Sequence, residues 1–189
     1  MADPARKLAT YADVLAAPPN MTAQVIGGDL HLQPRPSKPH TIATSALGEE
    51  LGPPFKRGRG GPGGWMILDA PELHLGDDIV VPDLAGWRRE RMQTVVDDLP
   101  YFTLAPDWVA EVLSPSTTRL DRTKKPRLYA QAGVSGLWFI DPVAKTLEVF
   151  ERGDQGQWVL RDAFSEDAKV KARPFDAITL DLSVLWAGT

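Results

Sequence analysis

The sequence predicts an α/β fold of the α+β kind, in which a central mixed β-sheet is flanked by helices. The main observation is a strand, a helix and a strand in succession, over 108–113, 124–132 and 136–141. Their spacing suits a right-handed parallel crossover. A short apolar strand at 65–68 precedes this unit, and an alternating segment at 146–151 follows it as a hairpin partner. Strands that pair in both directions make the sheet mixed.

Length and composition predict one soluble domain over 1–189. The chain has 189 residues, 43% of them hydrophobic and 24% charged, which are ordinary values for a globular protein. It has no cysteine, so disulfides, thiolate catalysis and thiolate zinc sites are excluded. The first residues do not resemble a secretory signal, and no run approaches the roughly 18 apolar residues of a membrane span. We therefore expect a cytoplasmic protein with no membrane contact.

The first third of the chain is predicted to form a short helix, a hairpin, a longer helix and a loop. Thr10 is expected to cap a helix over 10–17, and a hairpin is expected over 23–33. The longer helix begins at Ser37 or His40 and presents one apolar face, formed by Ile42, Ala46, Leu47 and Leu51. Residues 52–64 are rich in Gly and Pro and are expected to form neither helix nor central strand. Their arginines and glycines can clasp a phosphate backbone, although a mobile loop is the favoured interpretation.

The other elements follow from turn and capping residues. Strands are expected at 72–75 and 78–87, and Pro82 must lie at an edge, at an irregularity or where pairing ends. Because Pro126 is tolerated only in the first turn of a helix, Thr123 is predicted as the N-cap of the crossover helix. Gly133 then follows that helix as its C′ residue. The remaining expectations are a short helix within 88–105, strands at 157–164 and 177–182, and a terminal helix at 182–186.

Two carboxylates interrupt apolar strand segments. Asp83 follows "IVVP", and Glu111 lies inside "WVAEVL", on the same strand face as Val109 and Leu113. An unpaired buried carboxylate is costly, so each acid needs a partner. If the two strands are neighbours, both acids can bind one Mg²⁺ or Mn²⁺ at the end of the sheet. The alternative is a structural salt bridge with a helix lysine or arginine, which spacing alone slightly favours.

Basic residues are clustered although the net charge is -4. Eleven of the 21 Lys and Arg lie in the stretches 56–59, 88–91 and 119–127. A locally basic surface on an acidic protein can still bind phosphates, and three solvated faces are an equally good interpretation.

Other site motifs are weak. The three histidines lie far apart in sequence, "GRGGPGG" lacks the Lys-Ser/Thr ending of a phosphate-binding loop, and Ser114 and Ser116 lack a nucleophile elbow. These serines are expected to brace a turn, and the six tryptophans to pack in the core or in a dimer interface.

Three segments carry a family resemblance. "VVPDLAGW", "PDWVAEVLSPSTTRLDRTKKPRLYAQAGVSGLWFIDP" and "TLEVF" resemble the Uma family of restriction-endonuclease-like proteins, within the PD-(D/E)xK nuclease superfamily. The likeness extends from about residue 10 to 150 and implies a restriction-endonuclease-like fold, with the nuclease core at about 65–150, an N-terminal hairpin and extra C-terminal strands.

The resemblance also implies roles for individual residues. Asp83 matches the metal-binding aspartate of the superfamily, and Glu111 matches the acid of the (D/E)xK element. Leu113 stands where the superfamily lysine usually lies. In this family the lysine is moved to the following helix, where Lys125 matches it and Lys124 is a possible substitute. The same pattern includes Tyr129, Gly133 and Val134, and weaker matches are Asp29 and His40.

The implied activity is Mg²⁺-dependent (or Mn²⁺-dependent) cleavage of DNA. Asp83 and Glu111 are expected to hold the metal, with the Val112 carbonyl as a further candidate ligand, and Lys125 to orient the attacking water or stabilise the transition state. The alternatives are a catalytically inactive nucleic-acid-binding or scaffold protein of the same fold, and a plain interaction domain with metal-free, salt-bridged acids. Double-strand cutting needs two active centres, so we expect a homodimer.

Overall fold

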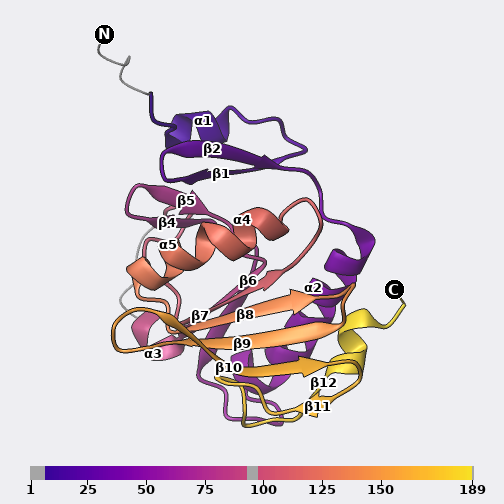
Figure 1. Cartoon of the computed structure of the whole chain (residues 1–189). Helices are drawn as coiled ribbons and strands as arrows, with labels where there is room; N and C mark the ends of the chain where they lie inside the picture. Colours follow the sequence, from indigo (N-terminus) through magenta and orange to yellow (C-terminus); the bar gives the residue numbers. More distant parts are fainter. Residues whose placement is uncertain (1–6, 93–97, 189) are drawn as a thin grey trace.

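The fold is organised around a six-stranded mixed sheet (Figure 1), seen in a computed structural model that describes residues 7–92 and 98–188. The strand order is β10-β9-β8-β7-β6-β3, and every neighbouring pair is antiparallel except β7 and β8. The strands are β3 (Trp65–Asp69), β6 (Leu84–Arg88), β7 (Trp108–Val112), β8 (Gly136–Asp141), β9 (Thr146–Arg152) and β10 (Trp158–Ser165). The predicted α+β fold with a mixed sheet is confirmed.

The parallel pair is joined by two consecutive helices, α4 (Thr118–Thr123) and α5 (Lys125–Ala132). The prediction that Thr123 caps the crossover helix is wrong, because Thr123 is the last residue of α4 and Lys124 stands between the helices. Pro126 lies in the first turn of α5, as predicted, and lacks the N–H that would continue the hydrogen bonds of α4. Gly133 ends α5 with φ of 87°, a left-handed conformation that favours glycine.

A second sheet of four strands lies against α4 and α5 on the side away from the six-stranded sheet (Figure 1). Its order is β2-β1-β5-β4, from β1 (Thr22–Ile26), β2 (Asp29–Gln33), β4 (Leu73–Leu75) and β5 (Asp78–Val80). The single strand predicted over 78–87 is therefore two strands in different sheets. Pro82 marks the break, since it has no N–H for a ladder hydrogen bond.

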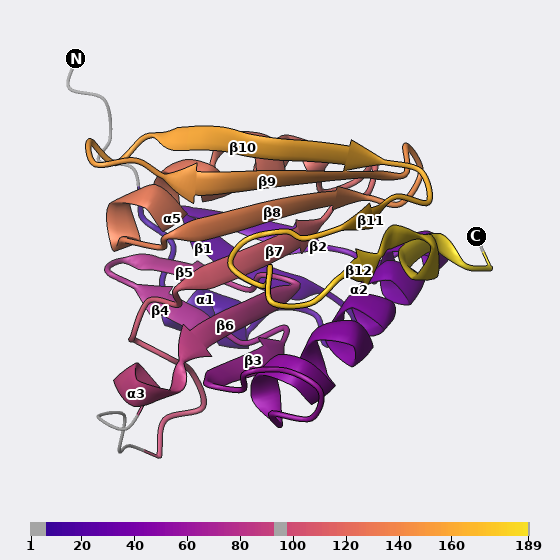
Figure 2. The same cartoon turned by 90° about the horizontal axis from the view of Figure 1, so that it is seen from below.

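The six-stranded sheet has an apolar core on each face. One core packs α2 (Lys38–Leu51) and the C-terminal segment against Trp108, Ala110 and Val112 of β7. The other core packs α5 against Val109 and Leu113, so Glu111 faces α5 as the alternation predicts. Figure 2 shows α2 and the C-terminal helix on the same side of the sheet.

The short elements complete the chain. Thr10 stands at the N-cap of α1 (Tyr11–Leu15), and its N–H donates to Asp13 Oδ2 at 2.8 Å. The others are α3 (Arg89–Met92), β11 (Lys169–Val170), β12 (Leu180–Asp181) and the 3₁₀ helix η2 (Leu182–Trp186). The strand predicted at 177–182 is reduced to the two residues of β12. Part of the predicted connection 88–105 lies outside the described residues. Among the residues described, no helix is both long and apolar enough to cross a membrane.

The predictions about α2 and its continuation hold only in part. Leu47 and Leu51 of the predicted apolar face are buried and Ala46 packs against the core, but Ile42 is only half-buried. His40 and Ala43 are buried instead, so the apolar face is rotated from the predicted one. Residues Gly52–Lys56, predicted as loop, form a π-helical turn, η1, that continues the helix. The turn tolerates two prolines because they occupy its first positions, where an N–H is not needed. Its Phe55 is 1% exposed and anchors the turn in the core.

Candidate active site

Asp83 stands where the chain passes from one sheet to the other. It follows Pro82 and directly precedes β6, which pairs with β7 so that Leu84 lies opposite Ala110. This pairing brings Asp83 beside the end of β7, where the Val112 N–H donates to Asp83 Oδ2 at 2.7 Å. The other carboxylate oxygen lies 3.0 Å from His40 Nε2, on α2. Asp83 is therefore held from two sides, and its side chain keeps 22% of its surface exposed.

Glu111 is buried on the α5 face of β7, with 1% of its surface exposed. Lys125 Nζ lies 3.0 Å from its Oε2, and the Tyr129 hydroxyl donates to its Oε1 at 2.5 Å. Lys125 and Tyr129 lie one helical turn apart on α5, so both reach the same strand. Glu111 thus has the salt bridge that the spacing suggests, together with a second donor.

Lys125 connects Glu111 with a third carboxylate. Its Nζ lies 3.0 Å from Asp121 Oδ1 on α4, and the Val81 carbonyl is 3.5 Å away. The contact with Asp121 is close enough for an ion pair but lacks hydrogen-bond geometry, so Oδ1 of Asp121 is buried without a hydrogen bond. The charge of Lys125, rather than a hydrogen bond, compensates this buried oxygen.

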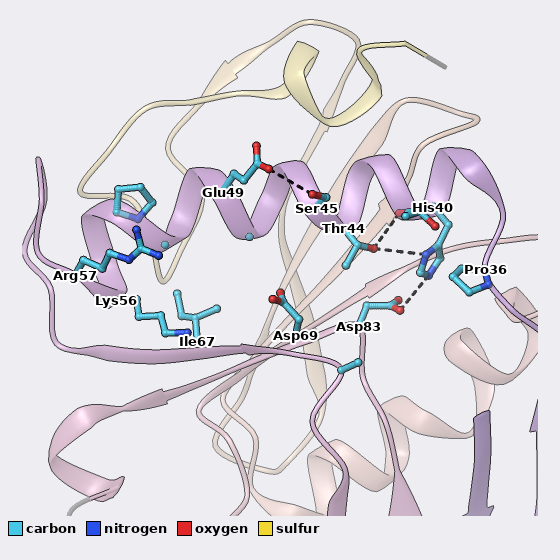
Figure 3. A pocket seen from close by; sticks show the side chains of 15 residues that line it. Pro36, His40, Thr44, Ser45, Glu49, Lys56, Arg57, Ile67, Asp69 and Asp83 are labelled. Carbon is cyan, nitrogen blue, oxygen red and sulfur yellow. Dashed lines mark hydrogen bonds and ion pairs between the residues drawn. The ribbon is translucent and has the colours of Figure 1, made fainter. Parts of the chain in front are cut away.

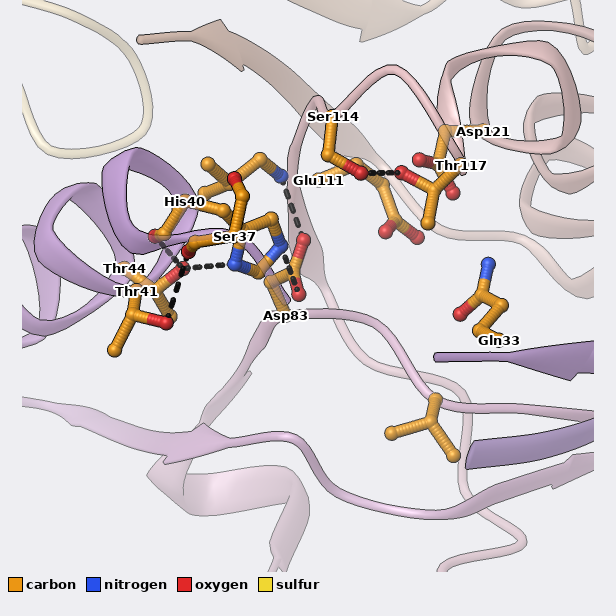
Figure 4. Close-up of polar contacts among 12 residues, drawn as sticks. Gln33, Ser37, His40, Thr41, Thr44, Asp83, Glu111, Ser114, Thr117 and Asp121 are labelled. Atoms are coloured by element: carbon orange, nitrogen blue, oxygen red, sulfur yellow. Dashed lines mark hydrogen bonds and ion pairs between the residues drawn. The ribbon is translucent and has the colours of Figure 1, made fainter. Parts of the chain in front are cut away.

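These side chains line one small pocket of about 160 Å³. Asp83, Glu111, Asp121, Lys125 and His40 all contribute to its wall, from five separate segments. Figure 4 shows Asp83 next to His40, with Glu111 and Asp121 turned toward the same space. The structure therefore brings the predicted aspartate, glutamate and helix lysine to one place.

Burial and the neighbouring charges shift the pKa values of three side chains in and beside the pocket. Burial raises the pKa of Glu111 to about 8, although the Lys125 ammonium opposes the rise. Burial alone would lower the pKa of Lys125, but Glu111, Asp121 and Asp83 raise it above its usual range, so Lys125 stays charged. Burial and the neighbouring carboxylate also raise the pKa of Tyr129, which remains a donor to Glu111. Perturbed groups of this kind cluster at functional sites.

The raised pKa makes the stability of the metal-free protein depend on pH. Below pH 8 the folded state keeps a proton on Glu111 that the unfolded chain releases above about pH 4.5, so the free energy of unfolding falls as pH rises through this window. Relative to Glu111→Gln, we expect the wild-type protein to lose about 2 kcal/mol between pH 6 and pH 8. Urea unfolding in the presence of a chelator measures this difference, and a constant difference would contradict the raised pKa.

Of the four additional site residues that the family resemblance implies, two contact the proposed metal ligands and two do not. His40 and Tyr129 contact Asp83 and Glu111 directly, as described above. Asp29 and Lys124 instead contact each other outside the pocket, at 3.4 Å, with side chains 43% and 44% exposed. Lys124 also lies 3.3 Å from His31 Nε2, and burial with this cation lowers the pKa of His31. Lys124 therefore does not share the position of Lys125.

Asp121 and the serine turn were missed from the sequence as pocket residues. Asp121 lies four residues before Lys125, a spacing that brings helix side chains together, but the segment was predicted as a turn rather than a helix. Ser114 lines the pocket and, as predicted, braces the turn, since its carbonyl accepts the N–H groups of Thr117 and Thr118.

The donors fit a hard divalent cation in part. Within residues 7–92 and 98–188, no three His, Asp or Glu side chains are grouped to hold a metal ion by themselves. Mg²⁺ commonly takes one or two carboxylates and completes its shell with water and phosphate oxygens. Asp83 and Glu111, with Asp121 lining the same pocket, match that requirement in chemistry and number.

The fold described above has a counterpart among solved structures. A solved structure from Anabaena variabilis ATCC 29413, described as a "putative nuclease belonging to DUF820", superposes with a TM-score of 0.76 at 24% identity. The match covers 95% of this chain and 98% of that one, and it establishes the fold.

The family is established by sequence. Residues 8–183 match the model of the Uma2 family, described as "Putative restriction endonuclease", and the chain belongs to that family. No curated protein matches the chain at a significant level.

Proposed function

We propose that this protein is a nuclease that hydrolyses phosphodiester bonds in DNA with the help of Mg²⁺ or Mn²⁺. The observation that carries the proposal is the convergence of Asp83, Glu111 and Lys125, from three separate elements, on one pocket. The description of the Uma2 family supports the same class of reaction.

Asp83 and Glu111 are the proposed metal ligands. A bound divalent cation would polarise the scissile phosphate and lower the pKa of an attacking water. Asp83 is oriented by the Val112 N–H and by His40, so that its carboxylate is already turned into the pocket. Glu111 must be ionised to bind a cation, and the hydrogen bond from Tyr129 favours that form.

Lys125 is proposed to provide the positive charge of the reaction. Its Nζ is fixed between Glu111 and Asp121, and the side chain is 2% exposed, so its position is defined before substrate arrives. A fixed ammonium group next to the scissile phosphate would stabilise the negative charge that develops on the phosphoryl oxygens. The same group would orient the water that attacks phosphorus.

The first experiment is cleavage of supercoiled plasmid by the purified protein, with Mg²⁺, Mn²⁺ or a chelator. We expect relaxed or linear product with a divalent cation and none with the chelator. Asp83→Asn, prepared in parallel, should lose this activity because the amide is a poor ligand. Equal nicking by both proteins would show that the activity does not come from this site.

A non-catalytic protein of the same fold is the competing function. It is favoured by the engagement of both Glu111 oxygens with Lys125 and Tyr129, which resembles a structural salt bridge. It does not explain why three carboxylates, Asp83, Glu111 and Asp121, line the same small pocket. The predicted homodimer belongs to the catalytic proposal, since two centres are needed to cut both strands.

A further inference from the structure

A longer groove continues from the acidic pocket along α2. It has a volume of about 730 Å³ and shares Asp83, His40, Pro36 and Ala70 with the acidic pocket. One wall is α2 and the other is the end of β3, as Figure 3 shows. From His40 to Gly52 the helix rises about 18 Å, which gives the approximate length of the groove.

The far end of the groove is basic. Lys56 and Arg57 line it there, opposite the end that holds Asp83 and His40 (Figure 3). Neither side chain forms an ion pair in the part of the chain that the structure describes, so both charges are available to a ligand. The backbone is fixed at this point, because Arg89 donates to the Lys56 carbonyl at 2.9 Å.

The middle of the groove is lined by acidic and hydroxyl side chains. Asp69 and Glu49 line it together with the hydroxyls of Thr41, Thr44 and Ser45. Carboxylates repel phosphates but accept hydrogen bonds from the amino groups of bases. A nucleic acid strand therefore fits with one phosphate at the basic end, another beside the cation that Asp83 would hold, and its base edges toward the acids.

The groove is too narrow for a duplex. A Cβ atom on Gly48 would lie 3.2 Å from Asp69 Oδ1 and 3.8 Å from Leu84 Cδ2, so α2 approaches the sheet closely along the groove floor. A volume of about 730 Å³ over a length of about 18 Å corresponds to a mean cross-section of about 40 Å². An unpaired strand fits such a slot, whereas two paired strands do not.

We propose that the α2 groove holds an unpaired nucleic acid strand next to the scissile phosphate, and that Lys56 and Arg57 bind a backbone phosphate at its far end. This inference rests on the proposed function for the identity of the ligand. It makes the substrate class a strand with an unpaired segment of about five nucleotides beside the cut, since successive nucleotides of a stacked strand are about 3.4 Å apart.

The test measures binding separately from cleavage. Fluorescently labelled 12-nucleotide single strands of DNA, and the corresponding blunt duplex, are titrated in chelator with the wild-type protein, with Lys56→Gln/Arg57→Gln and with Lys169→Gln/Lys171→Gln. The last variant removes the same charge from two exposed lysines, one in β11 and one directly after it, that lie outside the groove. We expect the groove variant to bind single strands about tenfold more weakly than the control variant. Its salt slope should be shallower by about 0.7 for each phosphate that the protein no longer neutralises.

The outcomes separate this inference from the proposed function. Equal binding by the two double variants, or equal binding of duplex and single strand by wild type, would overturn the groove assignment. If cleavage at the same time depends on Asp83, the nuclease function stands and only the groove assignment fails. A protein that cuts no substrate but loses strand binding when Lys56 and Arg57 are replaced would support the groove and refute catalysis.

Discussion

Glu111→Gln is expected to lower the rate of DNA cleavage by on the order of a thousandfold, without loss of DNA binding. The amide keeps the shape of the side chain and its contact with Tyr129, but it removes a charged ligand from the proposed metal site. A metal ion contributes several kcal/mol to transition-state stabilisation, and 1.4 kcal/mol corresponds to a factor of about ten in rate. Single-turnover cleavage of plasmid at saturating protein measures the chemical step, and fluorescence anisotropy measures binding.

Glu148→Gln is the matched control. Glu148 lies on β9, pairs with Arg122 and is outside the acidic pocket. The same chemical change there should leave the cleavage rate within about twofold of wild type. If Glu111→Gln kept a rate near that of Glu148→Gln, Glu111 would have no part in the reaction.

Lys125→Met is expected to lower the free energy of unfolding by about 3 to 5 kcal/mol. The lysine side chain is 2% exposed and is the cation between two carboxylates, Glu111 and Asp121, that are themselves buried. Methionine fills a similar volume but leaves Asp121 buried without a counter-charge and removes a hydrogen-bond donor to Glu111. Urea unfolding followed by tryptophan fluorescence measures the loss.

Lys124→Met is the control for Lys125→Met, because it makes the same substitution at the neighbouring but exposed lysine. Lys124 precedes Lys125 directly, but its side chain is 44% exposed and its partner Asp29 is 43% exposed. Solvent screens this ion pair, so the change should cost no more than about 0.5 kcal/mol. Similar losses for the two variants would contradict the description of Lys125 as the central cation of the pocket.

The strands and the crossover helix of the sheet could be predicted because short sequence segments determine them. The segment 108–141 contains apolar strands and a helix with clear end signals, so its parallel crossover follows from length and handedness. The strand alternation also placed Glu111 on the face of Val109 and Leu113, and the structure confirms that placement. A carboxylate on an apolar face requires a partner, which made it a candidate site residue.

The rest of the site depends on contacts between distant segments. His40 reaches Asp83 only because α2 packs against β3 and β7, and the residue spacing contains no sign of this. Both His40 and Tyr129 were named from the family resemblance rather than from physical reasoning. Asp121 was missed because the sequence of α4 was interpreted as a turn before the crossover helix, since Pro126 follows α4 so closely. The groove along α2 depends on η1, where prolines predict a loop but occupy positions that need no N–H.

The most direct test of the proposed metal site is the anomalous scattering of crystals soaked in Mn²⁺. We expect one strong peak in the acidic pocket, within coordination distance of one Asp83 oxygen and one Glu111 oxygen, and its loss in Asp83→Asn crystals. No peak at concentrations that support cleavage, or a peak that contacts neither carboxylate, would contradict it.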